Sequence, residues 1–218
     1  MNQIHLKGQG EPVRVGKIVC LGRNYVDHIK ELGNEMPSSP VIFIKPASSI
    51  IRSGEQIRIP DYSSDCHHEV ELAVLIGKTG SCLTEAEAMD VVAGYGVAID
   101  LTLRDVQSRL KAKGLPWEIA KGFDTACPLS DFVPATEIDD PHQLQLTIKV
   151  NGEIRQDGNT RLMMRTIPRF ISEVSAIFTL QPGDILLTGT PAGVSRISSG
   201  DRIIAEIEQV GSLDVSVA

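Results

Sequence analysis

Long hydrophobic runs are missing from this chain of 218 residues, and aromatic side chains make up only 4% of it. A membrane-spanning helix needs about 18 or more consecutive apolar residues, and no such stretch occurs. Residues 1–16 contain neither the apolar core of a secretion signal nor the arginine-rich pattern of an import signal. The sequence therefore predicts a protein that is not inserted in a membrane.

Basic clusters are missing as well. The chain has 21 lysines and arginines against 28 acidic residues, a net charge of −7. Nucleic acids and anionic membrane surfaces bind to concentrated positive charge, so both are excluded as expected partners. An anionic substrate would have to be attracted by cations gathered locally in the fold.

Paired cysteines and nucleophile motifs do not occur either. The four cysteines form no C-x-x-C pair, which favours reduced thiols and a cytoplasmic protein. No G-x-S-x-G motif is present, so serine catalysis is not favoured. The segment 189–193 lacks the Lys-Ser/Thr ending of a phosphate-binding loop and is either an ordinary turn or one in which Thr190 contacts a ligand carboxylate. Among the common kinds of catalysis, metal-ion and acid–base chemistry therefore remain.

An acidic pair interrupts the most apolar part of the chain. Residues 70–76 read as a buried strand, yet Glu71 lies within it and Glu69 just before it. Side chains alternate along a strand, so both carboxylates point to one face, about 7 Å apart. Burying them without a partner is costly, and a cation should therefore meet this face.

A third carboxylate, Asp100, ends the second buried strand, which is predicted at residues 94–100. Three carboxylates form the oxygen donor set that suits Mg²⁺ or Mn²⁺ and leave coordination positions for substrate. Ion pairs with buried lysine or arginine are the alternative, and the pattern alone favours neither. Zinc is a weaker alternative, because His67 and His68 beside Cys66 point to opposite faces of a strand.

An acid–base pair is predicted in the helix at residues 25–32, which Asn24 should cap and Gly33 should end. His28 and Glu31 lie three residues apart on its flank and can form a hydrogen bond. The alternative is a solvated Glu31 and a histidine that serves packing. The polar loop at residues 34–40 follows and could act as a lid.

Other elements follow from local signals. A capping box of Thr84 and Glu87 predicts a helix to about Val92, Thr102 should cap a helix over residues 103–113, and Pro168 should kink or divide a helix over residues 161–180. Residues 58–60 read as a short edge strand. The Asn-Gly dipeptide at 151–152 predicts a hairpin between strands 144–150 and 153–156.

Six motifs together resemble the fumarylacetoacetate hydrolase family, in its short branch of acylpyruvate hydrolases, oxaloacetate decarboxylases and oxaloacetate tautomerases. They span most of the chain: G-R-N-Y-x-x-H-x-x-E at 22–31, H-H-E-V-E-L at 67–72, G-Y-x-x-x-x-D at 94–100, R-D-x-Q at 104–107, K-x-F-D at 121–124, and L-x-x-G-D-I-L-L-T-G-T-P at 180–191.

The resemblance implies an α+β, mostly β fold: a mixed β-roll or flattened barrel with peripheral helices in a single domain. Residues 1–16 would be an N-terminal extension and 17–218 the catalytic domain, with a lid at about 24–40, and the protein would be a homodimer. It further implies roles for nine residues, namely metal ligands Glu69, Glu71 and Asp100, catalytic residues His28, Glu31 and Lys121, and substrate-binding residues Arg23, Gln107 and Thr190.

These roles lead to a hypothesis in which a small 2-oxo acid chelates Mg²⁺ or Mn²⁺ and reacts through an enolate. Hydrolysis of acylpyruvates to pyruvate and a carboxylic acid is the first reading, with His28 activating water. Oxaloacetate tautomerisation or decarboxylation at the same site is the alternative. A non-catalytic metal-binding protein would not need His28, Glu31 and Lys121 together.

Overall fold

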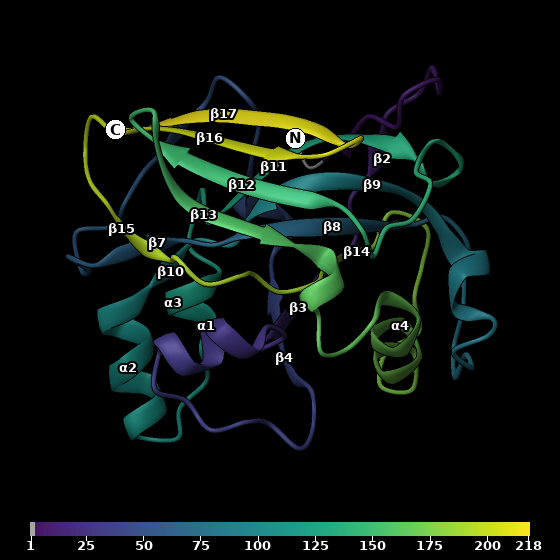
Figure 1. Cartoon of the computed structure of the whole chain (residues 1–218), viewed down its shortest axis with the longest axis horizontal. Coiled ribbons are helices and arrows are strands. Elements are labelled where there is room, and N and C mark those ends of the chain that lie inside the picture. The colour runs from purple at the N-terminus through teal and green to yellow at the C-terminus, as the bar shows by residue number, and fades with distance from the viewer. Residues whose placement is uncertain (1–2) are drawn as a thin grey trace.

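Two stacked β-sheets form the framework of the computed structural model, which describes residues 3–218 (Figure 1). The larger sheet is mixed, with β14 parallel to β3, β11 parallel to β5, and the other neighbours antiparallel. Its strand order is β4 (Val41–Lys45), β3 (Ile18–Gly22), β14 (Ile185–Leu187), β8 (Val70–Ile76), β9 (Val92–Ile99), β11 (Cys127–Pro134) and β5 (Ile50–Ile51).

The second sheet has five strands and covers one face of the first, where β12 contacts β8, and β16 and β17 contact β9. Its order is β13 (Glu153–Asn159), β12 (Gln145–Val150), β16 (Arg202–Ile207), β17 (Gly211–Val217) and β6 (Gln56–Ile57). Smaller sheets join β10 (Thr102–Leu103), β7 (Cys66–His68) and β15 (Ser195–Ile197), and β1 (Gln3–Ile4) with β2 (Val13–Arg14).

The helices lie outside the stacked sheets, gathered along the lower side of Figure 1. They are α1 (Val26–Glu31), α2 (Arg104–Ala112), α3 (Glu118–Lys121) and α4 (Ile167–Ser175). The predicted fold class, a mostly β roll with peripheral helices in a single domain, is confirmed. Among the described residues no helix has the length and apolarity to cross a membrane. The predicted boundary at residue 17 stays a prediction.

Strand β8 is buried on both faces. Leu72 and Val74 belong to the core shared with the five-stranded sheet, whereas Ala73 and Leu75 belong to a second core on the opposite face. Two dry faces explain why this strand reads as an uninterrupted apolar run. By alternation, Glu71 shares the face of Ala73 and Leu75, at the end of the strand where the second core gives way to a cavity.

Two predicted helix starts are wrong. The Thr84–Glu87 box forms, with Thr84 Oγ1 donating to Glu87 Oε2 at 2.7 Å, but only a 3₁₀ turn (Ala88–Val91) follows. The chain has no room for a longer helix because Val92 already pairs with Ile76 in the sheet. Thr102 does not cap α2; it pairs with His67 as part of β10.

Asn24 and Pro168 also differ from the predictions. Asn24 makes no cap on α1; its side chain bonds to backbone groups of Arg165 and Thr188 instead. Pro168 lies in the first turn of α4, where its missing N–H is not needed, so it starts the helix and causes no kink. The short strand lies at β6, before residues 58–60. The hairpin at Asn151 and Gly152 is confirmed.

Candidate active site

Three buried carboxylates meet at the ends of β8 and β9. Glu69 immediately precedes β8 and Asp100 immediately follows β9, and Asp100 N donates to Glu69 O at 2.8 Å. Glu69, Glu71 and Asp100 are 4%, 2% and 1% exposed, and one oxygen from each lies within 4.8 Å of the others. The three carboxylates are thus close enough for one cation to bridge them.

Buried cations also contact this cluster, so the ion-pair alternative is realised in the same place. Lys121 Nζ lies 2.9 Å from Glu69 Oε2 and 2.6 Å from Asp100 Oδ2. Arg104 at the start of α2 forms an ion pair with the other oxygen of Glu69. Lysine and arginine fix two of the carboxylates in place without filling the region between all three.

Lys45, at the end of β4, was missed by the sequence analysis. It is fully buried, and its ammonium donates to the carbonyl oxygens of Leu101 at 3.0 Å, Ala126 at 2.9 Å and Lys121. These bonds use all three of its protons. Asp100 Oδ1 lies 2.7 Å from Lys45 Nζ but has no hydrogen-bond partner with acceptable geometry. This buried carboxylate oxygen thus lacks a hydrogen-bond donor among the described residues, which fits a metal ligand.

The two glutamates ionise differently. Burial and the charges of Asp100 and Glu69 raise the pKa of Glu71 well above its usual range, although Gly189 N donates to its Oε2 at 2.7 Å. Burial also opposes ionisation of Glu69, but Lys121 and Arg104 outweigh it and hold its pKa well below the usual range. Glu71 is therefore the carboxyl that resists ionisation most, and a divalent cation held beside it would favour its charged form.

His28 and Glu31 come together on α1 as predicted. His28 Nδ1 lies 3.4 Å from Glu31 Oε2, and Gly193 N donates to both oxygens of Glu31, at 3.0 and 3.2 Å. Burial, with Arg104 nearby, lowers the pKa of His28, and the charges of Glu69 and Glu31 oppose this without reversing it. The imidazole is therefore neutral near pH 7 and can accept a proton.

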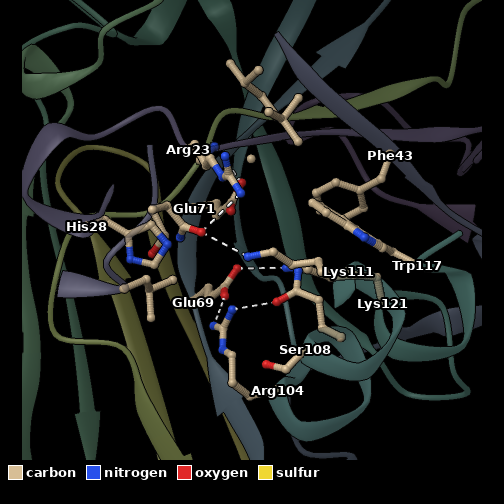
Figure 2. Close-up of a pocket in the computed structure, with 18 residues that line it drawn as sticks. Arg23, His28, Phe43, Glu69, Glu71, Arg104, Ser108, Lys111, Trp117 and Lys121 are labelled. Carbon is tan, nitrogen blue, oxygen red and sulfur yellow. Dashed lines mark hydrogen bonds and ion pairs between the residues drawn. The ribbon is translucent and has the colours of Figure 1, made fainter. Parts of the chain in front are cut away.

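A cavity of about 250 Å³ joins these groups (Figure 2). Seven of the nine predicted residues line it; Asp100 and Glu31 lie behind Lys121 and His28 respectively. The lining includes Arg23, His28, Glu69, Glu71, Gln107, Lys121 and Thr190 from the predictions, and Arg104, Lys111, Phe43 and Trp117 in addition.

Arg104 and an aromatic pair hold the predicted side chains in place. Arg104 Nη1 donates to Gln107 Oε1 at 2.9 Å, which the i, i+3 spacing of the R-D-x-Q motif explains. The Lys121 ammonium lies 4.7 Å from the centre of the Phe43 ring, and Phe43 packs on Trp117 at 6.0 Å between ring centres. The aromatic wall on this side keeps Lys121 pointed at the carboxylates.

Thr190 is held by a residue that sequence reasoning missed. Its hydroxyl donates to Val70 O and accepts from Gln156 Nε2, both at 2.8 Å. Gln156 is fully buried and also bonds to Pro191 O, Val70 N and His68 Nδ1. No local pattern marks Gln156, because it alternates with exposed residues of β13 like any inward-facing strand residue.

The zinc alternative finds no support within residues 3–218. His67 Nε2 lies 2.9 Å from Asp65, whereas His68 is occupied by Gln156 and by Ser195 Oγ. The two histidines thus have separate partners on opposite faces of β7. Among the described residues, Glu69, Glu71 and Asp100 form the one group of three or more metal-binding side chains that lie close enough together.

Comparisons with known proteins show which family the chain matches. The family model described as fumarylacetoacetate (FAA) hydrolase C-terminal matches residues 17–218. The mitochondrial oxaloacetate tautomerase of Mus musculus is 52% identical over 200 residues, covering 92% of this chain and 90% of that protein. The mitochondrial oxaloacetate decarboxylase of Dictyostelium discoideum is 50% identical over 188 residues, 86% of each chain.

A solved structure extends the similarity to three dimensions. The crystal structure of fumarylpyruvate hydrolase from Pseudomonas aeruginosa, in complex with Mn²⁺ and pyruvate, matches with a TM-score of 0.94 and 33% identity. The match covers 99% of this chain and 95% of that one. The relatives are enzymes that act on small 2-oxo acids, as their names state.

Proposed function

Because this chain belongs to the fumarylacetoacetate hydrolase family and is an enzyme of that family, we propose that it acts on oxaloacetate, interconverting the keto and enol forms with the help of a divalent metal. One observation carries the proposal. A neutral histidine and a cluster of three buried carboxylates line or border one cavity of about 250 Å³, just below the roughly 300–1,000 Å³ of most ligand pockets. A four-carbon acid suits that volume.

Glu69, Glu71 and Asp100 would hold the metal, for which Mg²⁺ and Mn²⁺ are the proposed ions. Their hard oxygen donors fit either ion, and the Pseudomonas aeruginosa relative binds Mn²⁺. When bound, such a cation supplies positive charge that stabilises the enolate oxygen of a 2-oxo acid. Lys121 donates hydrogen bonds to Glu69 and Asp100, which fixes both carboxylates, and it adds positive charge to the same wall of the cavity.

Proton transfer is assigned to His28. Its lowered pKa keeps the imidazole neutral, so it can remove a proton from C3 of the keto form and deliver it to the enolate oxygen, which gives the enol. Glu31 orients the ring through Nδ1 and is itself fixed by Gly193 N. Gln107, Arg23 and Thr190 line the cavity and are assigned to the substrate, with Thr190 fixed in its turn by a hydrogen bond to Val70 O.

Hydrolysis of acylpyruvates, the first hypothesis from the sequence, is the second candidate. The specific observation in its favour is the shape match to fumarylpyruvate hydrolase, whose structure contains pyruvate. In that reaction His28 would take the proton of an attacking water. Decarboxylation of oxaloacetate is a third outcome on the same residues, supported by the Dictyostelium discoideum relative.

One assay separates these reactions. Protein treated with a chelator and reloaded with Mg²⁺ or Mn²⁺ is given oxaloacetate and acetylpyruvate, while enol absorbance, CO₂ and pyruvate are followed separately. We expect metal-dependent loss of enol absorbance without CO₂ release. Full activity after removal of the metal would refute the metal role, and pyruvate formed from acetylpyruvate at the greater kcat/KM would favour the hydrolase.

His28→Asn provides the companion test, with the exposed His5→Asn as its matched control. Loss of a general base lowers rates by roughly 10²- to 10⁴-fold, so His28→Asn should lose tautomerisation and His5→Asn should keep it. An unchanged kcat in the His28→Asn variant would show that His28 is not the general base.

Three further expectations from the sequence remain proposals. Residues 24–40 would act as a lid, the protein would be a homodimer, and it would be cytoplasmic. Since the Mus musculus and Dictyostelium discoideum relatives are mitochondrial by name, cell fractionation is the relevant measurement for location. Light scattering of the purified protein would test the dimer.

A further inference from the structure

Two cations of the cavity are not used by the acidic cluster. Of the acidic cluster, Asp100 pairs with the buried Lys45 and Lys121, and Glu69 pairs with Lys121 and the partly buried Arg104. Arg23 and Lys111 also line the cavity, and neither forms an ion pair with any described residue. Their positive charge is therefore available to a ligand.

The two cations approach one another from different elements (Figure 2). Arg23 precedes α1, and Lys111 lies in the last turn of α2. Both donate to one neutral oxygen: Asn34 Oδ1 accepts from Arg23 Nη2 at 3.1 Å and from Lys111 Nζ at 2.9 Å. Partial burial and the charges of Arg23 and Arg104 lower the pKa of Lys111. Like charges are thus held close together without an anion between them, which is unfavourable unless a ligand supplies one.

The position of the pair decides which part of a ligand it would meet. The acidic cluster and Lys121 form the wall at which the 2-oxo acid end would be held under the proposed function. Arg23, Asn34 and Lys111 line the same cavity but take no part in that cluster. A small 2-oxo acid lying across the cavity would place its remote end beside them.

We propose that Lys111, together with Arg23 and the amide of Asn34, forms a second anion subsite that binds the carboxylate remote from the 2-oxo group, so that the enzyme selects 2-oxo dicarboxylates over 2-oxo monocarboxylates. This inference rests on the proposed function for the placement of the 2-oxo end. Two charged donors and one amide suit a carboxylate, which accepts two or more charge-assisted hydrogen bonds. Lys111 is a specificity residue in this arrangement and takes no part in proton transfer.

The helix end alone does not account for Lys111. Cations near a helix C-terminus are favourable in general, and Lys113 is as close to the end of α2 as Lys111. Both lysines are exposed, but the Lys113 side chain has no hydrogen bond or ion pair among the described residues and does not line the cavity. Lys113 therefore has the same charge and helix position as Lys111 but no contact with the cavity, which makes it the matched control.

The first test compares two substrates in the Lys111→Met and Lys113→Met variants loaded with metal. The substrates are oxaloacetate and its 4-methyl ester, in which a neutral ester replaces the remote carboxylate. A lost charge-assisted hydrogen bond corresponds to about a 10- to 100-fold weaker interaction. Lys111→Met should raise KM for oxaloacetate by that factor with kcat changed less than about threefold, and should leave KM for the ester unchanged. Lys113→Met should change neither, and Lys111→Arg should retain most of the preference.

The second test is independent of turnover. Calorimetry on the metal-loaded protein compares 2-oxoglutarate with 2-oxopentanoate, which differ only in the remote carboxylate. We expect the dicarboxylate to bind at least about tenfold more tightly to the wild type and to Lys113→Met, and the difference to disappear in Lys111→Met. A wild type that binds both acids equally or binds neither, or a Lys111→Met variant that keeps the preference, would overturn the subsite. A wild type that prefers the dicarboxylate but turns over neither oxaloacetate nor acetylpyruvate would instead refute the proposed function alone.

Discussion

Lys45 Nζ lies 2.7 Å from Asp100 Oδ1, and both side chains are excluded from solvent. The same ammonium holds three backbone carbonyls, those of Leu101, Lys121 and Ala126. One side chain thus fixes the end of β9, the end of α3 and the start of β11 around a carboxylate of the acidic cluster.

Lys45→Met should destabilise the protein strongly. Removing one member of a buried ion pair costs about 3–5 kcal/mol, and methionine would also leave three buried carbonyl oxygens without their donor, although Lys121 still pairs with Asp100. Urea unfolding measures this loss. Lys7→Met removes a lysine from an exposed pair with Glu137 and should leave the midpoint unchanged. If Lys45→Met and the wild type unfold at the same urea concentration, the prediction is wrong, and water must solvate Asp100 in place of the lysine.

Glu71→Gln should weaken metal binding while leaving the fold intact. The substitution keeps the shape of the side chain and an oxygen that can accept from Gly189 N, but it removes a negative charge from the donor set. Since ligand charge tunes affinity for divalent cations, we expect a fall of roughly tenfold or more. Calorimetric titration with Mn²⁺ measures it, and the exposed Glu87→Gln serves as the control. If Glu71→Gln binds Mn²⁺ as tightly as the wild type, Glu71 is not a metal ligand.

Gln156→Met should slow catalysis although Gln156 does not line the cavity. It removes the bonds to Thr190 Oγ1 and Pro191 O that hold the turn from which Gly189 N reaches Glu71. We expect a loss of about 2 kcal/mol in unfolding free energy and about a tenfold lower kcat. Gln145→Met, at an exposed position of β12, should affect neither. A normal kcat in a destabilised Gln156→Met protein would mean that the turn holds its position unaided.

His142 should make stability depend on pH. Its Nε2 accepts from Ile167 N at the start of α4, at 3.0 Å, which only the neutral ring can do. Burial lowers the pKa of His142 in the folded protein, and Asp140 opposes this in part. The unfolded chain then binds more protons than the folded protein between that lowered pKa and the usual value near 6.5, so stability rises with pH across this window.

The measurement is urea unfolding at several values between pH 7.5 and pH 5. Stability of the wild type should be complete above about pH 6.5 and should fall as the pH drops through the folded-state pKa. His142→Asn keeps an acceptor that does not titrate and should show a shallower fall. Parallel curves for the two proteins would indicate that the other buried histidines, rather than His142, set the slope.

The acidic cluster was predictable because it depends on short-range rules. Alternation along one strand puts Glu69 and Glu71 on one face, and a strand end placed Asp100 beside them. This placement requires only that the two apolar strands β8 and β9 pair as neighbours. They do so with Val70 opposite Ile99.

Lys45 and Gln156 were not predictable in the same way. The partners of Lys45 are 56 to 81 residues away along the chain, and Gln156 bonds to His68 across 88 residues. Only the assembled sheets bring such groups together. The Thr84 box shows the converse case, because its local hydrogen bonds form as expected but sheet pairing at Val92 overrides the helix they predict.

The burial of β8 on both faces affects how the protein opens. Backbone amides in such a strand exchange with solvent only when both apolar cores separate, so they should be among the slowest to exchange in the molecule. The exposed residues Glu35 and Met36, in the loop that follows α1, have no comparable protection. The carboxylates at the end of β8 would then keep their arrangement when the loop that follows α1 opens locally. The three oxygen donors would separate only when the whole domain unfolds.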